Sequence, residues 1–75
     1  MSVTKGDIVQ LNPDSVRNKA FAGCFMTITQ VHKGWVVGYV QCLGETFVKE
    51  GGAAYYRAAL LEFEGPVGRA IWVKS

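Results

Sequence analysis

The chain has 75 residues, of which 49% are hydrophobic and 19% are charged. This length accommodates one small domain and not two, and this composition is too apolar for an intrinsically disordered chain. We therefore expect a single domain over residues 1–75. The formal net charge is only +2, whereas proteins that bind nucleic acid usually carry a clearer basic stripe. Charge therefore does not indicate a nucleic-acid partner, although it does not remove that alternative.

The sequence also bears on location and on metal binding. No apolar run approaches the roughly 20 residues of a membrane-spanning helix, and the first residues hold no apolar stretch of signal-peptide length. We expect a cytoplasmic protein with no membrane partner. Cys24, Cys42 and the single histidine, His32, lack the spacing of zinc ligands, so no metal is expected. Two cysteines within apolar runs are typical of buried, reduced thiols in an intracellular protein, and this is the interpretation we prefer. The alternative is a cross-strand disulfide or a redox pair.

The first third of the chain predicts one strand and a long loop. Residues 8–11 are a short apolar strand, and Asn12-Pro13-Asp14 after it is a turn signal. The polar segment 12–23 is long for a hairpin loop and has few large apolar residues other than Val16 and Phe21. We expect this loop to be mobile.

The middle of the chain contains the clearest hairpin. Residues 24–31 and 35–42 are rich in β-branched and aromatic residues and flank His32-Lys33-Gly34. A three-residue connection centred on Lys33 would pair Cys24 with Cys42, Met26 with Val40, Ile28 with Gly38 and Gln30 with Val36, and this set is the predicted core face. The opposite face would pair Phe25 with Gln41, Thr27 with Tyr39, Thr29 with Val37 and Val31 with Trp35, because side chains alternate along a strand.

The last third predicts a second loop over 43–52, a strand over 53–58 and a final strand over 69–73. Between these strands, residues 59–64 are too few for a regular helix, so a short 3₁₀ or helical turn is predicted. The alternative is a strand over 60–64 that forms a final hairpin. Gly65-Pro66-Val67-Gly68 is expected to break the chain before the last strand.

Five short strands, a long first loop, a tight turn between strands two and three and a short turn before the last strand resemble the Src-homology-3-like small β-barrel. The opening Lys5-Gly6-Asp7-Ile8-Val9-Gln10-Leu11, with Gly23 and Gly38-Tyr39-Val40 further on, looks like the start of a KOW-type element. The layout is also similar to the type II dihydrofolate reductases, which are small barrels that act as tetramers. In general character the chain resembles a small phage or prophage protein. The fold class implied is an all-β, five-stranded small barrel.

The usual catalytic constellations are missing from the sequence. His32 falls in a predicted turn, and the serines lie in a loop or near the termini. Glu62 and Glu64 flank Phe63, and we expect both carboxylates to be exposed on either side of one buried ring. The glycine pairs lack the lysine and hydroxyl of a phosphate-binding loop. We therefore predict no enzymatic activity, no catalytic residues and no cofactor.

The aromatic residues of the hairpin are the most informative feature for function. Phe25, Trp35, Val37 and Tyr39 belong to the face opposite Cys24, Met26, Ile28 and Val40, and a barrel of this size has room inside for one of the two sets. An exposed aromatic face is typical of an interface. The sequence therefore predicts a non-enzymatic binding module that engages a protein partner or a second copy of itself. The other interpretation is that the long loops fold over this face and bury it.

Two further functions stay open. A single-stranded nucleic-acid binder would use Tyr55 and Tyr56 for base stacking beside Arg57 and Arg69. An oligomeric enzyme would assemble its site only at a subunit junction, and its activity would fall on dilution.

Overall fold

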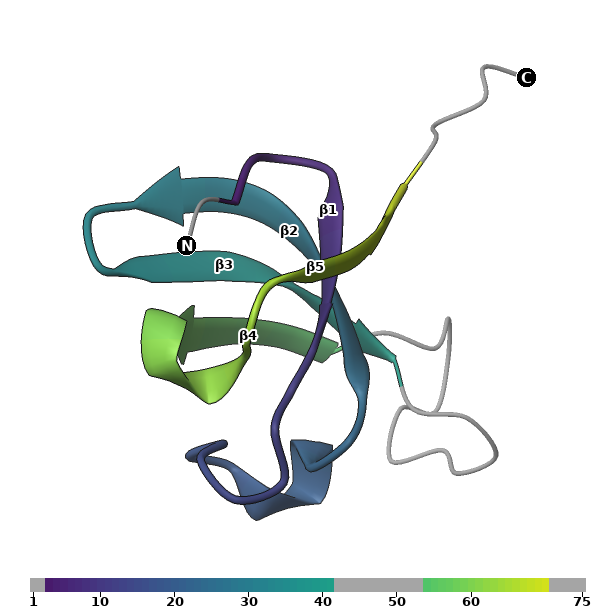
Figure 1. Ribbon diagram of the computed structural model, residues 1–75, viewed down its shortest axis with the longest axis vertical. Coiled ribbons are helices and arrows are strands. Elements are labelled where there is room, and N and C mark those ends of the chain that lie inside the picture. Colours follow the sequence, from purple (N-terminus) through teal and green to yellow (C-terminus); the bar gives the residue numbers. More distant parts are fainter. Residues whose placement is uncertain (1–2, 42–53, 71–75) are drawn as a thin grey trace.

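The computed structural model describes residues 3–41 and 54–70, which form an all-β domain built on one antiparallel sheet of five strands (Figure 1). The strands are β1 (Asp7–Gln10), β2 (Phe25–His32), β3 (Trp35–Gln41), β4 (Ala54–Ala59) and β5 (Pro66–Arg69). Their order in the sheet is β4-β3-β2-β1-β5, so the first and last strands are neighbours and β4 and β5 form the two edges. The predicted pairing of Cys42, the predicted loop over 43–52 and the predicted strand residues 71–73 lie outside the described part of the chain.

The predicted central hairpin is confirmed, but its register is correct only over half its length. Near the open end Phe25 pairs with Gln41 and Met26 with Val40, as predicted. Near the turn His32 pairs with Trp35 and Gln30 with Val37, because the connection is Lys33-Gly34 alone. Gly34 has φ +85°, a conformation that L side chains rarely adopt.

A β-bulge at Thr29 reconciles the two halves of this register. The pairing shifts between Ile28 and Gln30, and the Thr29 hydroxyl donates to the Val37 carbonyl at 3.2 Å. The predicted pairs of Thr29 with Val37, Gln30 with Val36 and Val31 with Trp35 are therefore wrong. A bulge inserts one unpaired residue into one strand, and the alternation of residue types does not reveal it.

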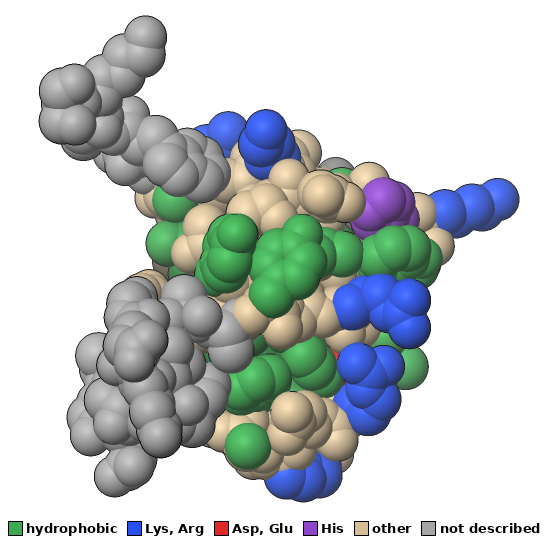
Figure 2. Space-filling model, turned by 180° about the vertical axis from the view of Figure 1, so that it is seen from behind, with side chains coloured by type: hydrophobic (Ala, Val, Ile, Leu, Met, Phe, Trp, Pro, Cys, Tyr) green, Lys and Arg blue, Asp and Glu red, His purple; other side chains and the backbone are tan. Residues whose placement is uncertain are grey.

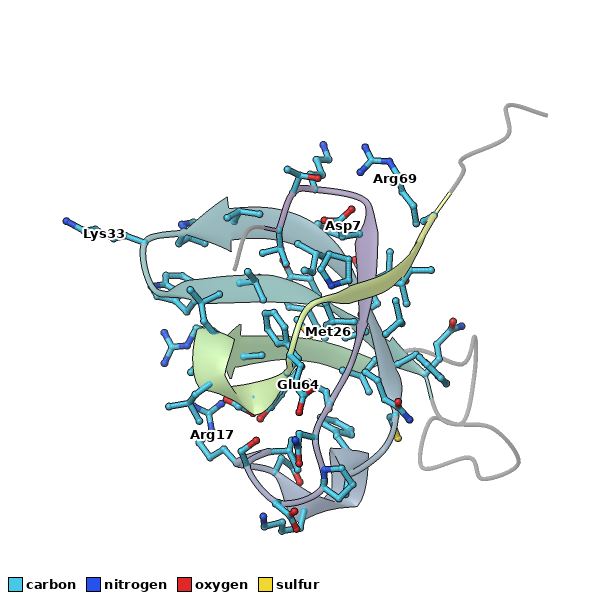
Figure 3. The ribbon with its side chains drawn as sticks, viewed as in Figure 1. Asp7, Arg17, Met26, Lys33, Glu64 and Arg69 are labelled. Carbon is cyan, nitrogen blue, oxygen red and sulfur yellow. The ribbon has the colours of Figure 1, made fainter. Side chains whose placement is uncertain are left out.

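The predicted core face of the hairpin is confirmed for Met26, Ile28, Val36 and Val40, but it is wrong for Gln30, which lies beyond the bulge and is exposed. Met26, Ile28, Val36 and Val40 are fully buried, and Met26 points into the middle of the domain (Figure 3). The core also receives side chains from β1, from β4 and from the segments beyond the strands: Val9, Leu11, Val16, Phe21, Cys24, Tyr56, Ala58 and Phe63. The sheet curves so that β1 and β5 cross in front of β2, β3 and β4 in Figure 1. The core lies between the two crossing strands and the other three.

Cys24 is buried and disulfide-bonded. The prediction of a reduced thiol is therefore wrong for this residue. That prediction rested on the cellular compartment, which does not determine whether a second sulfur lies within bonding distance.

The segment between β1 and β2 packs against the core. Val16 is 1% exposed and Phe21 is 7% exposed. This segment contains a 3₁₀ turn, η1 (Lys19–Phe21), which the sequence did not predict. Asn18 caps the start of this turn, because its side-chain Oδ1 accepts a 3.0 Å hydrogen bond from the Ala20 amide. Mobility of this segment stays a prediction, but Val16 and Phe21 attach it to the core at two points.

A short 3₁₀ turn before the last strand is confirmed as η2 (Leu60–Glu62), so the alternative strand over 60–64 is wrong. The last strand begins earlier than predicted, at Pro66, and includes residues expected to break the chain. Proline and glycine are tolerated there because β5 is an edge strand, bonded on one side only to β1.

Among the described residues, no helix has the length and apolarity needed to cross a bilayer.

Candidate functional site

Three aromatic side chains lie exposed and adjacent on the outer face of β2, β3 and β4, the face opposite the core. Phe25 is 41% exposed, Tyr39 46% and Tyr55 55%. Tyr39 and Tyr55 are directly opposite each other across β3 and β4, with ring centroids 5.0 Å apart and an interplanar angle of 64°. Phe25 pairs with Gln41, which is two residues beyond Tyr39 and shares its face. We call Phe25, Tyr39 and Tyr55 the aromatic strip.

Trp35, predicted to belong to this surface, is half-buried and already in contact with two other side chains. Its ring stacks on His32 with centroids 3.9 Å apart and an interplanar angle of 15°. The Arg57 guanidinium carbon lies 5.2 Å from the Trp35 ring centroid. Val37, also predicted as a contact residue, is only 7% exposed. The exposed aromatic area is therefore centred on Tyr39 and Tyr55 and not on Trp35.

The described surface is more basic than the net charge indicates. Two of the four described carboxylates, Asp7 and Glu62, are buried. Asp14 and Glu64 are the exposed ones. The exposed cations among the same described residues are Lys5, Arg17, Lys19, Lys33, Arg57 and Arg69. Figure 2 shows hydrophobic side chains across the middle of the outer face and Lys or Arg side chains around them, at the top, the right and the bottom of the view.

The structure does not bring together the residues of the alternative nucleic-acid groove. Tyr56 is 7% exposed, with its ring in edge contact with Phe21 at a centroid distance of 5.0 Å. Arg57 lies on β4, whereas Arg69 lies on β5 at the other edge of the sheet. Arg69 Nη1 is 2.9 Å from Oδ1 of Asp7, and the pair lies beside the start of β1 (Figure 3). Only Tyr55 and Arg57 of that set share an exposed face.

Sequence reasoning missed a buried polar cluster around Glu62, which is 2% exposed rather than solvated. Its Oε1 accepts hydrogen bonds from the Tyr56 hydroxyl at 2.5 Å and from the Arg17 amide at 3.0 Å. Its Oε2 accepts from the Ala59 amide at 2.8 Å. The position of Glu62 three residues after Ala59 was the only local signal, because an acidic residue there can turn back to the amide that precedes a helical turn.

The hydrogen bonds around Glu62 keep its carboxylate ionised. Desolvation by burial acts against the charge, but the donors from Tyr56, Arg17 and Ala59 outweigh it and hold the pKa of Glu62 below its ordinary value of 4.5. Burial, together with the bond to Glu62, raises the pKa of Tyr56 above 10.0. The cluster therefore stays a carboxylate with a neutral phenol and has no exposed group with which to perform chemistry.

Arg17 extends this cluster to the edge of the sheet. Its Nη2 donates a 3.0 Å hydrogen bond to the Arg57 carbonyl, and its guanidinium carbon lies 5.4 Å from the Tyr56 ring centroid. The outward-facing Ala59 amide is bonded to Glu62. Two backbone groups at the open edge of β4 are thus already satisfied, which protects this edge against pairing with another strand.

The described residues form no recognisable reaction centre. They contain no group of three or more His, Cys, Asp or Glu side chains that could hold a metal ion. Two shallow hollows occur at the surface, of about 250 Å³ and about 530 Å³. The smaller is lined by Gln10, Leu11, Asn12, Pro13, Glu64, Gly65 and Val67, and the larger by Val3, Thr4, Lys5, Thr29, Gln30, Val31 and His32. The smaller hollow contains one side chain of acid–base character, Glu64, and the larger contains two, Lys5 and His32, but none of the three is hydrogen-bonded to a nucleophile in its hollow.

Comparison with protein families, with curated proteins and with solved structures finds no match to this chain.

Proposed function

We propose that this chain is a non-enzymatic binding module that engages a protein through the aromatic strip. The observation that carries the proposal is the exposure of Phe25, Tyr39 and Tyr55 side by side on three neighbouring strands. Tyrosine supplies a large contact area at a low cost in side-chain entropy, and residues of this type dominate the energetics of many interfaces. Contiguous aromatic exposure on a small domain is consistent with such a role.

We further propose that the sheet is a small barrel of the Src-homology-3-like type. Its support is the strand order β4-β3-β2-β1-β5, the long segment after β1 and the 3₁₀ turn between β4 and β5. In such a barrel, the outer face of β2 to β4 projects away from the core, and the aromatic strip is available to a partner without any opening of the domain.

Selection of peptides tests the proposed function. A phage-displayed library of random peptides is panned on the immobilised protein, and synthetic copies of the selected peptides are titrated by fluorescence anisotropy. We expect Tyr39→Ala to weaken binding roughly tenfold or more, because a central aromatic contact residue contributes 2 kcal/mol or more at many interfaces. The thermal midpoint of the variant should stay close to that of the wild type, because Tyr39 is not in the core.

Leu61→Ala is the matched control. Leu61 is a large apolar side chain on η2 that is 72% exposed, but it lies outside the aromatic strip. Its removal should leave peptide binding unchanged. Peptides that bind Tyr39→Ala and the wild type equally well, or a library that yields no binder at all, would contradict the proposal. A single-stranded oligothymidylate titrated at two salt concentrations tests the nucleic-acid alternative, whose binding would weaken steeply with salt.

A further inference from the structure

Arg57 is a cation within the aromatic face. It lies two residues after Tyr55 on β4, so both side chains project from the same side of the sheet. Its guanidinium lies against the Trp35 ring, and its backbone carbonyl is held by Arg17. Within residues 3–41 and 54–70, no hydrogen bond or ion pair engages the Arg57 guanidinium. The one ion pair in this part of the chain joins Arg69 to Asp7.

None of the four described carboxylates forms an ion pair with Arg57. Asp7 is bonded to Arg69 at the other side of the sheet, and Glu62 is enclosed by its three donors. The strands that carry the aromatic strip, β2, β3 and β4, contain no Asp or Glu. The described strands of this face therefore offer a positioned guanidinium among aromatic rings and no negative charge of their own.

We propose that the partner of the aromatic strip is a different protein chain, which presents a carboxylate to Arg57 beside an apolar side chain that packs on Tyr39 and Tyr55. The inference rests on the proposed function and specifies the chemistry of its partner. A guanidinium binds a carboxylate through two parallel hydrogen bonds, and aromatic neighbours that exclude water strengthen such a pair. The contact with the Trp35 ring reduces the freedom that Arg57 loses on binding.

A second copy of this chain is a poor occupant of the same face. In a closed dimer the same patch meets itself, so Arg57 of each copy would enter an interface that contains no carboxylate from β2, β3 or β4. Burial of an unpaired charge is costly. A head-to-tail contact could bring Glu64 of one copy to Arg57 of the next, but such contacts do not form a closed dimer, and they generate larger rings or open chains instead.

A nucleic acid also fits this face less well than an acidic protein does. Phosphate-driven binding uses several cations along one groove. Arg17 lies next to Arg57, but its guanidinium already donates to the Arg57 carbonyl and lies over the Tyr56 ring. Arg57 is the cation contributed by the exposed face of β4, while Arg69 is at the other edge of the sheet and Tyr56 is buried. One guanidinium beside an apolar surface is suited to a single carboxylate anchor.

The same peptide library tests this inference when it is panned in parallel on the wild type and on Arg57→Gln. We expect the wild type to select peptides enriched in Asp or Glu close to an apolar residue, and Arg57→Gln to lose that enrichment. Synthetic copies should bind Arg57→Gln roughly tenfold or more weakly, the effect of a lost charge-assisted hydrogen bond. Lys5→Gln removes the same charge from an exposed position outside β2, β3 and β4, and it should bind these peptides as the wild type does.

Several outcomes would overturn the inference. Selected peptides could be no richer in Asp and Glu than the starting library, Arg57→Gln could select the same acidic peptides, or sedimentation velocity could show a dimer that Tyr39→Ala dissociates. Salt-sensitive binding of oligothymidylate that is lost in Arg57→Gln would assign the face to nucleic acid and overturn it as well. Peptides that require Tyr39 but carry no carboxylate would leave the proposed function standing while this inference fails.

Discussion

The hydroxyl of Tyr56 on β4 donates a 2.5 Å hydrogen bond to Oε1 of Glu62 on η2, and the segment between β1 and β2 is bonded to this buried pair. The amides of Arg17 and Asn18 bond to the two members of the pair, to Glu62 Oε1 at 3.0 Å and to the Tyr56 hydroxyl at 3.3 Å. The Asn12 amide bonds to the Glu62 carbonyl at 2.8 Å. A long loop is thereby attached to the sheet through polar contacts in addition to Val16 and Phe21.

Glu62→Gln should destabilise the domain by about 2–3 kcal/mol, because the amide group of Gln places a donor where one of the three existing donors needs an acceptor. Chemical denaturation with urea measures the change in the free energy of unfolding. Glu64→Gln is the control, since Glu64 is exposed two residues away, and it should shift stability by less than about 0.5 kcal/mol. Equal stability of Glu62→Gln and the wild type would show that the cluster contributes nothing.

Stability should fall in acid because two carboxylates are more acidic in the folded chain than their ordinary values. The pKa of Asp7 is lowered chiefly by the backbone hydrogen bond from Thr4, with a further contribution from Arg69, and the pKa of Glu62 is lowered by its three donors against desolvation. A lowered folded pKa means that the stabilisation is complete above the ordinary values, 3.8 for Asp and 4.5 for Glu, and is lost as pH falls through the folded pKa. Urea denaturation in a series of acidic buffers measures this slope.

Glu62→Gln should flatten the acid slope, since the substituted amide does not titrate in this range. An unchanged slope in this variant would assign the acid sensitivity to other groups.

Gly38→Ala should destabilise the domain by at least about 3 kcal/mol. A Cβ at Gly38 would overlap the carbonyl oxygen of Thr27 and lie 2.8 Å from its carbonyl carbon, so the backbone of β2 would have to move. Gly65→Ala is the matched control, because a Cβ there meets no atom within 4 Å. Its effect should be close to zero or slightly stabilising, through the reduced entropy of the unfolded chain. Thermal unfolding followed by circular dichroism compares the two variants, and equal midpoints would refute the predicted overlap.

Around Val16 and Phe21, the segment between β1 and β2 should be nearly as rigid as the sheet. Its polar composition had led us to expect a mobile loop. Both side chains are buried, and the neighbouring amides of Arg17 and Asn18 are hydrogen-bonded. Backbone ¹⁵N relaxation should give order parameters near 0.85, the value typical of rigid backbone, for these residues. Values below about 0.6 throughout the segment would mean that these anchors do not hold in solution.

The local pattern of residues was sufficient to predict the two strands of the central hairpin and, up to the bulge at Thr29, its core face. Met26, Ile28 and Val40 alternate with Phe25, Thr27 and Tyr39, and alternation alone separates a buried face from an outer one. The same pattern indicated the exposed positions of Phe25 and Tyr39. These features depend only on neighbours along the chain and across one tight turn, which is why sequence reasoning reached them.

Tertiary structure decided what the alternation could not. Thr29 became a bulge because a two-residue turn and the pairing at the far end of the hairpin require different registers. Tyr56 and Glu62 became buried partners because Arg17, 45 residues from Glu62 in sequence, supplies a donor at the point where the two side chains meet. Arg57 and Arg69 were separated because the strand order places them on opposite edges of the sheet. Each of these outcomes depends on contacts between distant segments, and a residue's own sequence neighbourhood does not encode such contacts.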